Sequence, residues 1–178
     1  RRYKSSIGPE AALPDNIICG ETTGSIAVTF SGGVANYTID WGTGSASGVT
    51  GSPYTITGLA VGSYTITVTD ANGSSAAAGP LVILYQPVHN VTKDTYYADI
   101  QVAINDAIAG DEIHVCAGTY SAPINIDRPL TLLGPNYNVS PITGSRVDEA
   151  IITGNIGAAT AAVTIGRPNN TISGVTIK

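Results

Sequence analysis

Residues 62–70, with the sequence GSYTITVTD, decide the fold class of the first half of the chain. Tyr64, Ile66 and Val68 alternate in this stretch with serine and threonine. A period of two residues is typical of a strand with one face on a core and the other in solvent. The same alternation over residues 26–30 predicts a second strand of this kind.

Glycine-rich turns separate further short strands around this stretch. The triplet Tyr-Thr-Ile occurs at 37–39, 54–56 and 64–66, and turn residues lie between the copies. Short alternating strands broken by turns predict a small antiparallel β-sandwich, which we place at residues 17–86. The proline-containing residues 1–16 are predicted to be a linker or an extended arm.

Several segments of the first half follow one template in order. They are GSIAVT at 24–29, SGG at 31–33, YTIDW at 37–41, ITGL at 56–59, GSYTITVTD at 62–70 and NG at 72–73. Together they resemble the immunoglobulin-like SprB-type repeat, a module found in tandem in surface adhesins of gliding bacteria. The resemblance covers residues 17–75 and implies an Ig-like sandwich on an extracellular protein. Family members often carry a second cysteine after the Asn-Gly, but here Ser74 and Ser75 follow, so Cys19 lacks that local partner.

The chain has two cysteines, Cys19 and Cys116, at a spacing that matches no metal motif. Two alternatives follow from the residues. The cysteines form one disulfide between the two halves, or they stay free and buried as small apolar side chains.

The second half begins with helical spacing. Between Asp94 and Gly110, Ile100, Ile104 and Ile108 fall on one face, which predicts a helix over 96–109. Thr95 is the expected N-cap and Gly110 the expected stop.

Short β-branched runs follow this helix and repeat. The segments TLLG at 131–134, IITG at 151–154 and TISG at 171–174 place their glycines 20 residues apart. Residues 126–129 also recur as residues 165–168, 39 positions later. A period near 20 with turn residues between β-branched triplets predicts a β-solenoid.

Residues 97–120 resemble the entry to a right-handed parallel β-helix, the superfamily of pectate-lyase-like enzymes and many non-catalytic surface proteins. We therefore expect an all-β chain: an Ig-like sandwich, a connector at 87–93, and a parallel β-helix at 94–178 with an N-terminal capping α-helix. A solenoid that stops at Lys178 would expose its core, so we expect the parent protein to continue or another chain to cover this end.

Amino-acid composition argues against several classes of function. Of 178 residues only 12% are charged, the net charge is −5, and no Lys or Arg lies between Lys4 and Lys93. Nucleic-acid binding is disfavoured because it needs clustered cations. No apolar stretch is long enough to span a membrane, so no membrane-spanning segment is expected. The missing trypsin-type cleavage sites fit either the composition bias of a β-rich domain or a surface selected for long survival outside the cell.

Acidic residues offer few catalytic or metal candidates. Asp148-Glu149 and Asp111-Glu112 are sequence neighbours, which do not present a carboxylate pair across a glycosidic bond. Asp70, two residues before Asn72-Gly73, is expected in a hairpin turn rather than a calcium loop. No catalytic, metal or cofactor-binding residue is therefore predicted.

The remaining candidate site residues are two histidines and one tryptophan. His114 is expected at a buried strand position beside Cys116, and His89 is alone in the connector. Trp41 is expected to pack across the sandwich, with stacking on a sugar ring as the alternative.

The favoured hypothesis is a secreted bacterial cell-surface protein with a structural or adhesive role, as an adhesin segment or a fibre subunit. Self-association would use the open coil end or the arm at 1–16, and glycans are further candidate partners. One alternative is the accessory module and first coils of a polysaccharide lyase or hydrolase whose active site lies beyond Lys178. Another is a carbohydrate-binding module that uses Trp41.

Overall fold

A computed structural model describes residues 7–121, 123–140, 142–154 and 161–178. The chain divides into two compact units, Arg1–Tyr85 and Gln86–Lys178, each with its own apolar core. Each unit is described by itself.

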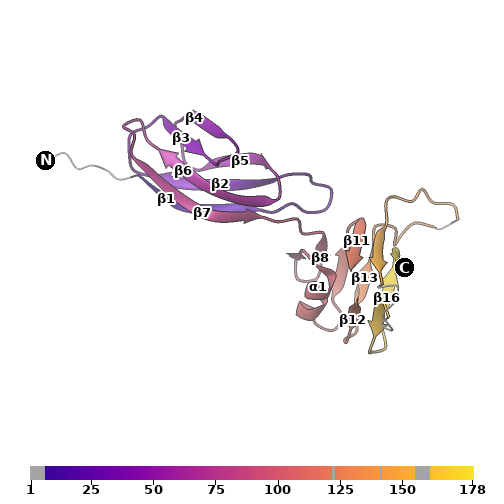
Figure 1. Cartoon of the computed structure of the whole chain (residues 1–178). Coiled ribbons are helices and arrows are strands. Elements are labelled where there is room, and N and C mark those ends of the chain that lie inside the picture. The colour runs from indigo at the N-terminus through magenta and orange to yellow at the C-terminus, as the bar shows by residue number, and fades with distance from the viewer. Residues whose placement is uncertain (1–6, 122, 141, 155–160) are drawn as a thin grey trace. The chain divides into compact units, whose positions relative to one another are not determined.

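The first unit is an antiparallel β-sandwich (Figure 1). Its strands are β1 (Gly8–Asp15), β2 (Gly24–Ser31), β3 (Tyr37–Asp40), β4 (Ser45–Val49), β5 (Tyr54–Leu59), β6 (Gly62–Thr69) and β7 (Ser75–Ile83). One sheet has the order β1-β2-β5 and the other β4-β3-β6-β7.

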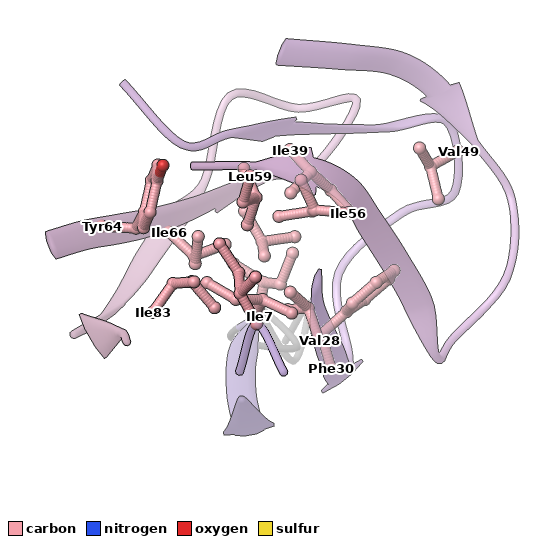
Figure 2. Packing of buried hydrophobic residues seen from close by; sticks show 13 residues of the cluster. Ile7, Val28, Phe30, Ile39, Val49, Ile56, Leu59, Tyr64, Ile66 and Ile83 are labelled. Atoms are coloured by element: carbon pink, nitrogen blue, oxygen red, sulfur yellow. The ribbon is translucent and has the colours of Figure 1, made fainter. Parts of the chain in front are cut away.

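The predicted alternation sets the core of this sandwich. Ile66 and Val68 of β6 are fully buried, while the threonines between and beside them stay at least partly accessible. The isoleucines of the three Tyr-Thr-Ile triplets lie on β3, β5 and β6 and meet in the same core, as Figure 2 shows for Ile39, Ile56 and Ile66. The strand predictions from period two are confirmed here.

The prediction of a linker or arm at residues 1–16 was wrong for Gly8–Asp15. These residues form β1 and pair antiparallel with β2, from Gly8 opposite Ser31 to Asp15 opposite Ser25. Local pattern does not reveal this strand, because its sequence GPEAALPD lacks alternation and contains two prolines. Prolines are tolerated on an edge strand, and β1 is at the edge of its sheet. Residues 1–6 lie outside the described residues.

The described residues of the second unit form short strands and one helix. They are β8 (Val88–Asn90), β9 (Thr95–Tyr97), α1 (Ile100–Asp106), β10 (Glu112–Val115), β11 (Gly118–Ser121), β12 (Ile124–Ile126), β13 (Thr131–Leu133), β14 (Ala150–Thr153), β15 (Val163–Ile165), β16 (Thr171–Ser173) and β17 (Val175–Ile177). β8 therefore lies inside the predicted connector at 87–93.

Three parallel ladders organise these strands. β10, β13 and β16 form one ladder, β11, β14 and β17 a second, and β12 and β15 a third. The chain visits the three ladders in this order and then returns to the first. At the start of the first ladder, β8 pairs antiparallel with β10, and β9 pairs antiparallel with β8.

The two predicted repeats agree with the observed strand pairing to different extents. Ile126 pairs with Ile165, so the recurrence at 39 positions is a structural repeat. The period near 20 holds for β10 and β13, where Glu112 pairs with Thr131. It fails for the glycine-ended triplets, because β13 pairs with β16 while β14 belongs to a different ladder. All three glycine-ended triplets are short strands, but only those of β13 and β16 are neighbours.

The core of the second unit draws on all three ladders. Ile126, Leu132 and Ile152 come from β12, β13 and β14, are fully buried, and belong to one apolar cluster. Ile100, Ala103 and Ile104 of α1 are buried in the same cluster, so the helix contributes its apolar face to this core. Figure 1 shows α1 beside β8.

The helix is shorter than predicted. Asp99, not Thr95, is the N-cap: its carboxylate accepts hydrogen bonds from the backbone N–H of Gln101 (2.7 Å) and Val102 (3.1 Å). Thr95 lies in β9 because that segment pairs with β8. The helix ends before Ile108, whose residue surface is 62% exposed rather than buried.

Candidate functional site

Two histidines occupy opposite positions on the outer surface of the β8–β10 pair. The register places His89 directly opposite His114. Their strand neighbours Val88, Asn90, Ile113 and Val115 are buried, and because strand side chains alternate, both imidazoles point away from the core. The exposed fractions of the two side chains are 22% and 34%.

A carboxylate holds each imidazole. His89 Nε2 lies 3.1 Å from Asp94 Oδ1, and His114 Nε2 lies 2.5 Å from Glu112 Oε1. Asp94 adopts a φ of 52° in the turn between β8 and β9, a conformation that aspartate tolerates better than most residues. Glu112 is two residues from His114 on β10 and so lies on the same face of the strand.

An aromatic ring also contacts each imidazole. Tyr96 of β9, opposite His89 in the register, stacks on it with ring centroids 4.1 Å apart. Tyr137, in the segment between β13 and β14, is tilted against His114 at 5.5 Å. We call His89, His114, Asp94, Glu112, Tyr96 and Tyr137 the histidine row.

The pattern within each segment did not predict this cluster. The prediction of a buried His114 was wrong, because the period of β10 buries Ile113 and Val115 and turns His114 outward. His89 was expected to stand alone, but strand pairing brings it beside His114. A usable signal existed: the segments Val-His-Asn and Ile-His-Val each carry histidine between two core positions.

Asp70 has a structural position, as expected from its turn sequence. Its Oδ1 accepts hydrogen bonds from the backbone N–H of Asn72 (3.0 Å) and Ser74 (2.8 Å). Its Oδ2 accepts one from Val34 N–H at 3.1 Å. The side chain therefore ties the β6–β7 turn to the loop after β2.

The carboxylate neighbours of the second unit have separate environments. Asp111 is buried and accepts hydrogen bonds from Asn90 Nδ2 (2.7 Å) and Ile108 N–H (3.0 Å). Glu149 accepts hydrogen bonds from Thr176 and Arg146, which hold the pKa of its carboxyl below the ordinary value. Asp148 is exposed. These carboxylates stabilise turns and neighbouring strands.

A second polar cluster joins the end of α1 to β9. Asp106 Oδ2 accepts hydrogen bonds from Tyr97 Oη (2.6 Å) and Lys93 Nζ (2.9 Å). The Lys93 and Tyr97 bonds lower the pKa of Asp106. Burial of its ring and the bond to Asp106 raise the pKa of Tyr97 to about 12.

The remaining candidates are the tryptophan and the cysteines. Trp41 is half-buried against the sandwich core and lies over Gly44, so packing is its observed role; sugar stacking stays a prediction. Neither cysteine is free: Cys19 and Cys116 are both disulfide-bonded.

Two negative findings concern the described part of the chain. It contains no group of three or more His, Cys, Asp or Glu side chains arranged to hold a metal ion. None of its helices is long and apolar enough to cross a membrane.

Comparison with protein families gives one result. Residues 12–46 match the SprB repeat model. The match covers the first strands of the sandwich and begins inside β1, which agrees with β1 being part of the module. It supports the resemblance found in the sequence over the first part of residues 17–75. No significant match to the chain was found among curated proteins or solved structures.

Proposed function

We propose that this chain is part of a secreted bacterial surface protein with an adhesive or structural role. The observation that carries the proposal is the SprB repeat match at residues 12–46, because this repeat is typical of surface-exposed proteins. The matched residues build the sandwich core: Ile26, Val28 and Ile39 are all fully buried. A self-contained sandwich of this kind suits a protein that presents modules outside the cell.

Surface display is tested with antibodies raised against the purified chain. We expect the antibodies to label intact, unpermeabilised cells of the producing bacterium, and brief protease treatment of the cells to remove the signal. Labelling only after permeabilisation would contradict the proposal. A cytoplasmic marker protein serves as the control for cell integrity.

Adhesion needs its own experiment. Beads coated with the full chain are expected to adhere to the surfaces that the bacterium colonises, and soluble chain should compete with the beads. Beads that carry the full chain with Asp70→Ala test whether adhesion depends on the sandwich loops, because this variant lacks the bonds that tie two of them together. Equal retention of native-chain beads and uncoated beads would reject an adhesive role and leave the structural one.

The second unit extends this proposal. We infer that its three ladders are the sides of a parallel β-helix, capped by β8, β9 and α1. The order in which the chain visits the ladders and the shared core of Ile126, Leu132 and Ile152 support this inference. In a closed coil these three side chains face one interior, so methyl NOEs should connect all three. Their absence in a folded sample would reject the closed coil.

Self-association is the partner that we propose. Ile165 and Ile177, on β15 and β17, are 52% and 51% exposed, whereas their register partners Ile126 and Ile152 are fully buried. β15 and β17 thus present apolar side chains that a second copy of the chain would cover. Sedimentation velocity should show concentration-dependent association that Ile165→Asp weakens. A monomer at every concentration would overturn this part alone.

A further inference from the structure

We propose that His89 and His114 together bind one divalent transition-metal ion, such as Zn²⁺, through their Nδ1 atoms. The inference concerns the second unit and does not depend on the proposed surface function. It starts from the histidine row, in which two imidazoles occupy opposite positions of an antiparallel strand pair.

Backbone geometry brings the two rings within reach of one ion. Side chains opposite each other in an antiparallel pair have Cβ atoms about 4.5–5.5 Å apart. Two nitrogens on a tetrahedral Zn²⁺, each bonded at about 2.1 Å, lie about 3.4 Å apart. His89 and His114 can therefore supply two adjacent ligands without any movement of the strands.

The hydrogen bonds of the imidazoles are those of metal-ligating histidines. Such a histidine usually donates its second ring nitrogen to a carboxylate, which fixes the tautomer and raises the basicity of the ligating nitrogen. Here Nε2 of each ring faces a carboxylate, Asp94 for His89 and Glu112 for His114. The structure gives neither Nδ1 a hydrogen-bond partner within the described residues, so both remain available as ligands.

The chemistry of the surroundings selects the class of ion. Imidazole suits Zn²⁺ and Cu²⁺, whereas Mg²⁺ and Ca²⁺ prefer oxygen ligands. Asp94 and Glu112 offset the charge of the bound cation. Cys19 and Cys116 are disulfide-bonded and do not compete as thiolate ligands.

The site uses two protein ligands, and water completes the coordination. This agrees with the finding that no three His, Cys, Asp or Glu side chains converge in the described residues. The carboxylates act in this arrangement by orienting the imidazoles. Tyr96 and Tyr137 restrict the rings from the sides.

The test is calorimetric titration of the full chain with Zn²⁺ near neutral pH in a buffer that does not chelate metals. We expect one ion per chain. His89→Gln and His114→Gln should each abolish binding, and circular dichroism checks that both variants are folded. Absence of binding to the native chain, or unchanged affinity in either folded histidine variant, would overturn the proposal.

Two carboxylate variants test whether Zn²⁺ binding depends on the carboxylates of the histidine row. Glu112→Gln should weaken Zn²⁺ binding by about 10-fold to 100-fold, the usual effect of removing a partner of a metal-ligating histidine. Asp148→Asn removes an exposed carboxylate outside the histidine row and should leave the affinity unchanged. Equal weakening in both variants would show diffuse electrostatic attraction instead of a built site. Long-range ¹⁵N spectra then identify the ligating nitrogen, and coordination through Nε2 would contradict the geometry.

Discussion

Asp70 shows how one side chain can organise a loop region at the residue scale. Its two carboxylate oxygens accept hydrogen bonds from three backbone N–H groups in two separate loops. The residue is 6% exposed, so removing the carboxylate would leave these N–H groups poorly solvated. The sequence indicated the turn at Asp70 but not the bond to Val34, which depends on how the loops meet.

We expect Asp70→Ala to lower the free energy of unfolding of the sandwich by about 3 kcal/mol. Trp41 is the only tryptophan of the chain and lies in the first unit, so its fluorescence during urea unfolding reports on the sandwich. Asp40→Ala is the matched control, because exposed Asp40 accepts one hydrogen bond, from Gly42 N–H. Equal losses in the two variants would contradict the role assigned to Asp70.

Tyr97 links stability to alkaline pH. Its pKa is raised from 10.0 to about 12 in the folded chain. A group with a raised pKa contributes stability below its unfolded pKa and loses it as pH rises through the folded pKa. The contribution of Tyr97 is therefore present below pH 10 and disappears towards pH 12. The absorbance titration of the native chain minus that of Tyr97→Phe should show one tyrosine ionising near the upper value; ionisation near 10 would contradict the prediction.

At the scale of the element, α1 illustrates competition between local and tertiary preferences. The helical spacing extends over 94–110, but Thr95–Tyr97 pair with β8 and become a strand. The helix then begins after Asp99. At the other end, the Arg128 guanidinium donates hydrogen bonds to the carbonyls of Ala107 (2.5 Å) and Asn105 (3.4 Å). Contacts distant in sequence thus shorten the helix.

The N-cap assignment can be tested directly. Asp99→Ala should lower the free energy of hydrogen exchange at the α1 amides by about 1 kcal/mol, the usual value for loss of an N-cap. Thr95→Ala, at the N-cap expected from the sequence, should change it by no more than about 0.5 kcal/mol, as for most surface substitutions. A larger effect at Thr95 than at Asp99 would reverse the assignment.

Two strands of the first ladder, β13 and β16, are each followed by a glycine, and the chain approaches closely at this pair. A Cβ on Gly134 would lie 2.1 Å from the carbonyl oxygen of Gly174, and one on Gly174 would lie 2.3 Å from Tyr137 N. Gly174 also has a φ of 69°, which favours glycine. Both clashes involve backbone atoms, so a side chain at either position would push adjacent strands apart.

We expect Gly134→Ala to destabilise the second unit by about 3 kcal/mol or more. Gly166→Ala is the matched control, since its nearest atom would lie at an ordinary contact distance of 3.6 Å, and its effect should be small. Hydrogen exchange at the amides of β13 and β16 measures both. Similar exchange in the two variants would show that the glycine contact is dispensable.

At the scale of the whole molecule, the sequence left open whether the two cysteines are disulfide-bonded or free. Both are disulfide-bonded in the structure. Alkylation of the unfolded chain should therefore modify no cysteine without reductant and both cysteines after reduction. Modification of either cysteine in the unreduced chain would contradict this state. Intact-mass spectrometry provides the measurement.

The sequence alone determined the sandwich strands, their buried faces and the presence of a second unit rich in short strands. These features follow from side-chain periodicity, which each segment carries within itself. The apolar residues of β2 and β6 had to face a core because no other arrangement buries them. The repeat of 39 residues was likewise visible, because equivalent positions on one ladder meet equivalent surroundings.

Which strands are neighbours depends on the tertiary structure. β1 lacks alternation and forms a strand because it pairs with the edge of β2. β14 resembles β13 in sequence but pairs with β11 and β17 in a different ladder. The histidine row has the same origin, since His89 and His114 lie 25 positions apart and meet through the register of β8 and β10. Strand pairing is a contact between distant segments, and the pattern within one segment does not encode its partner.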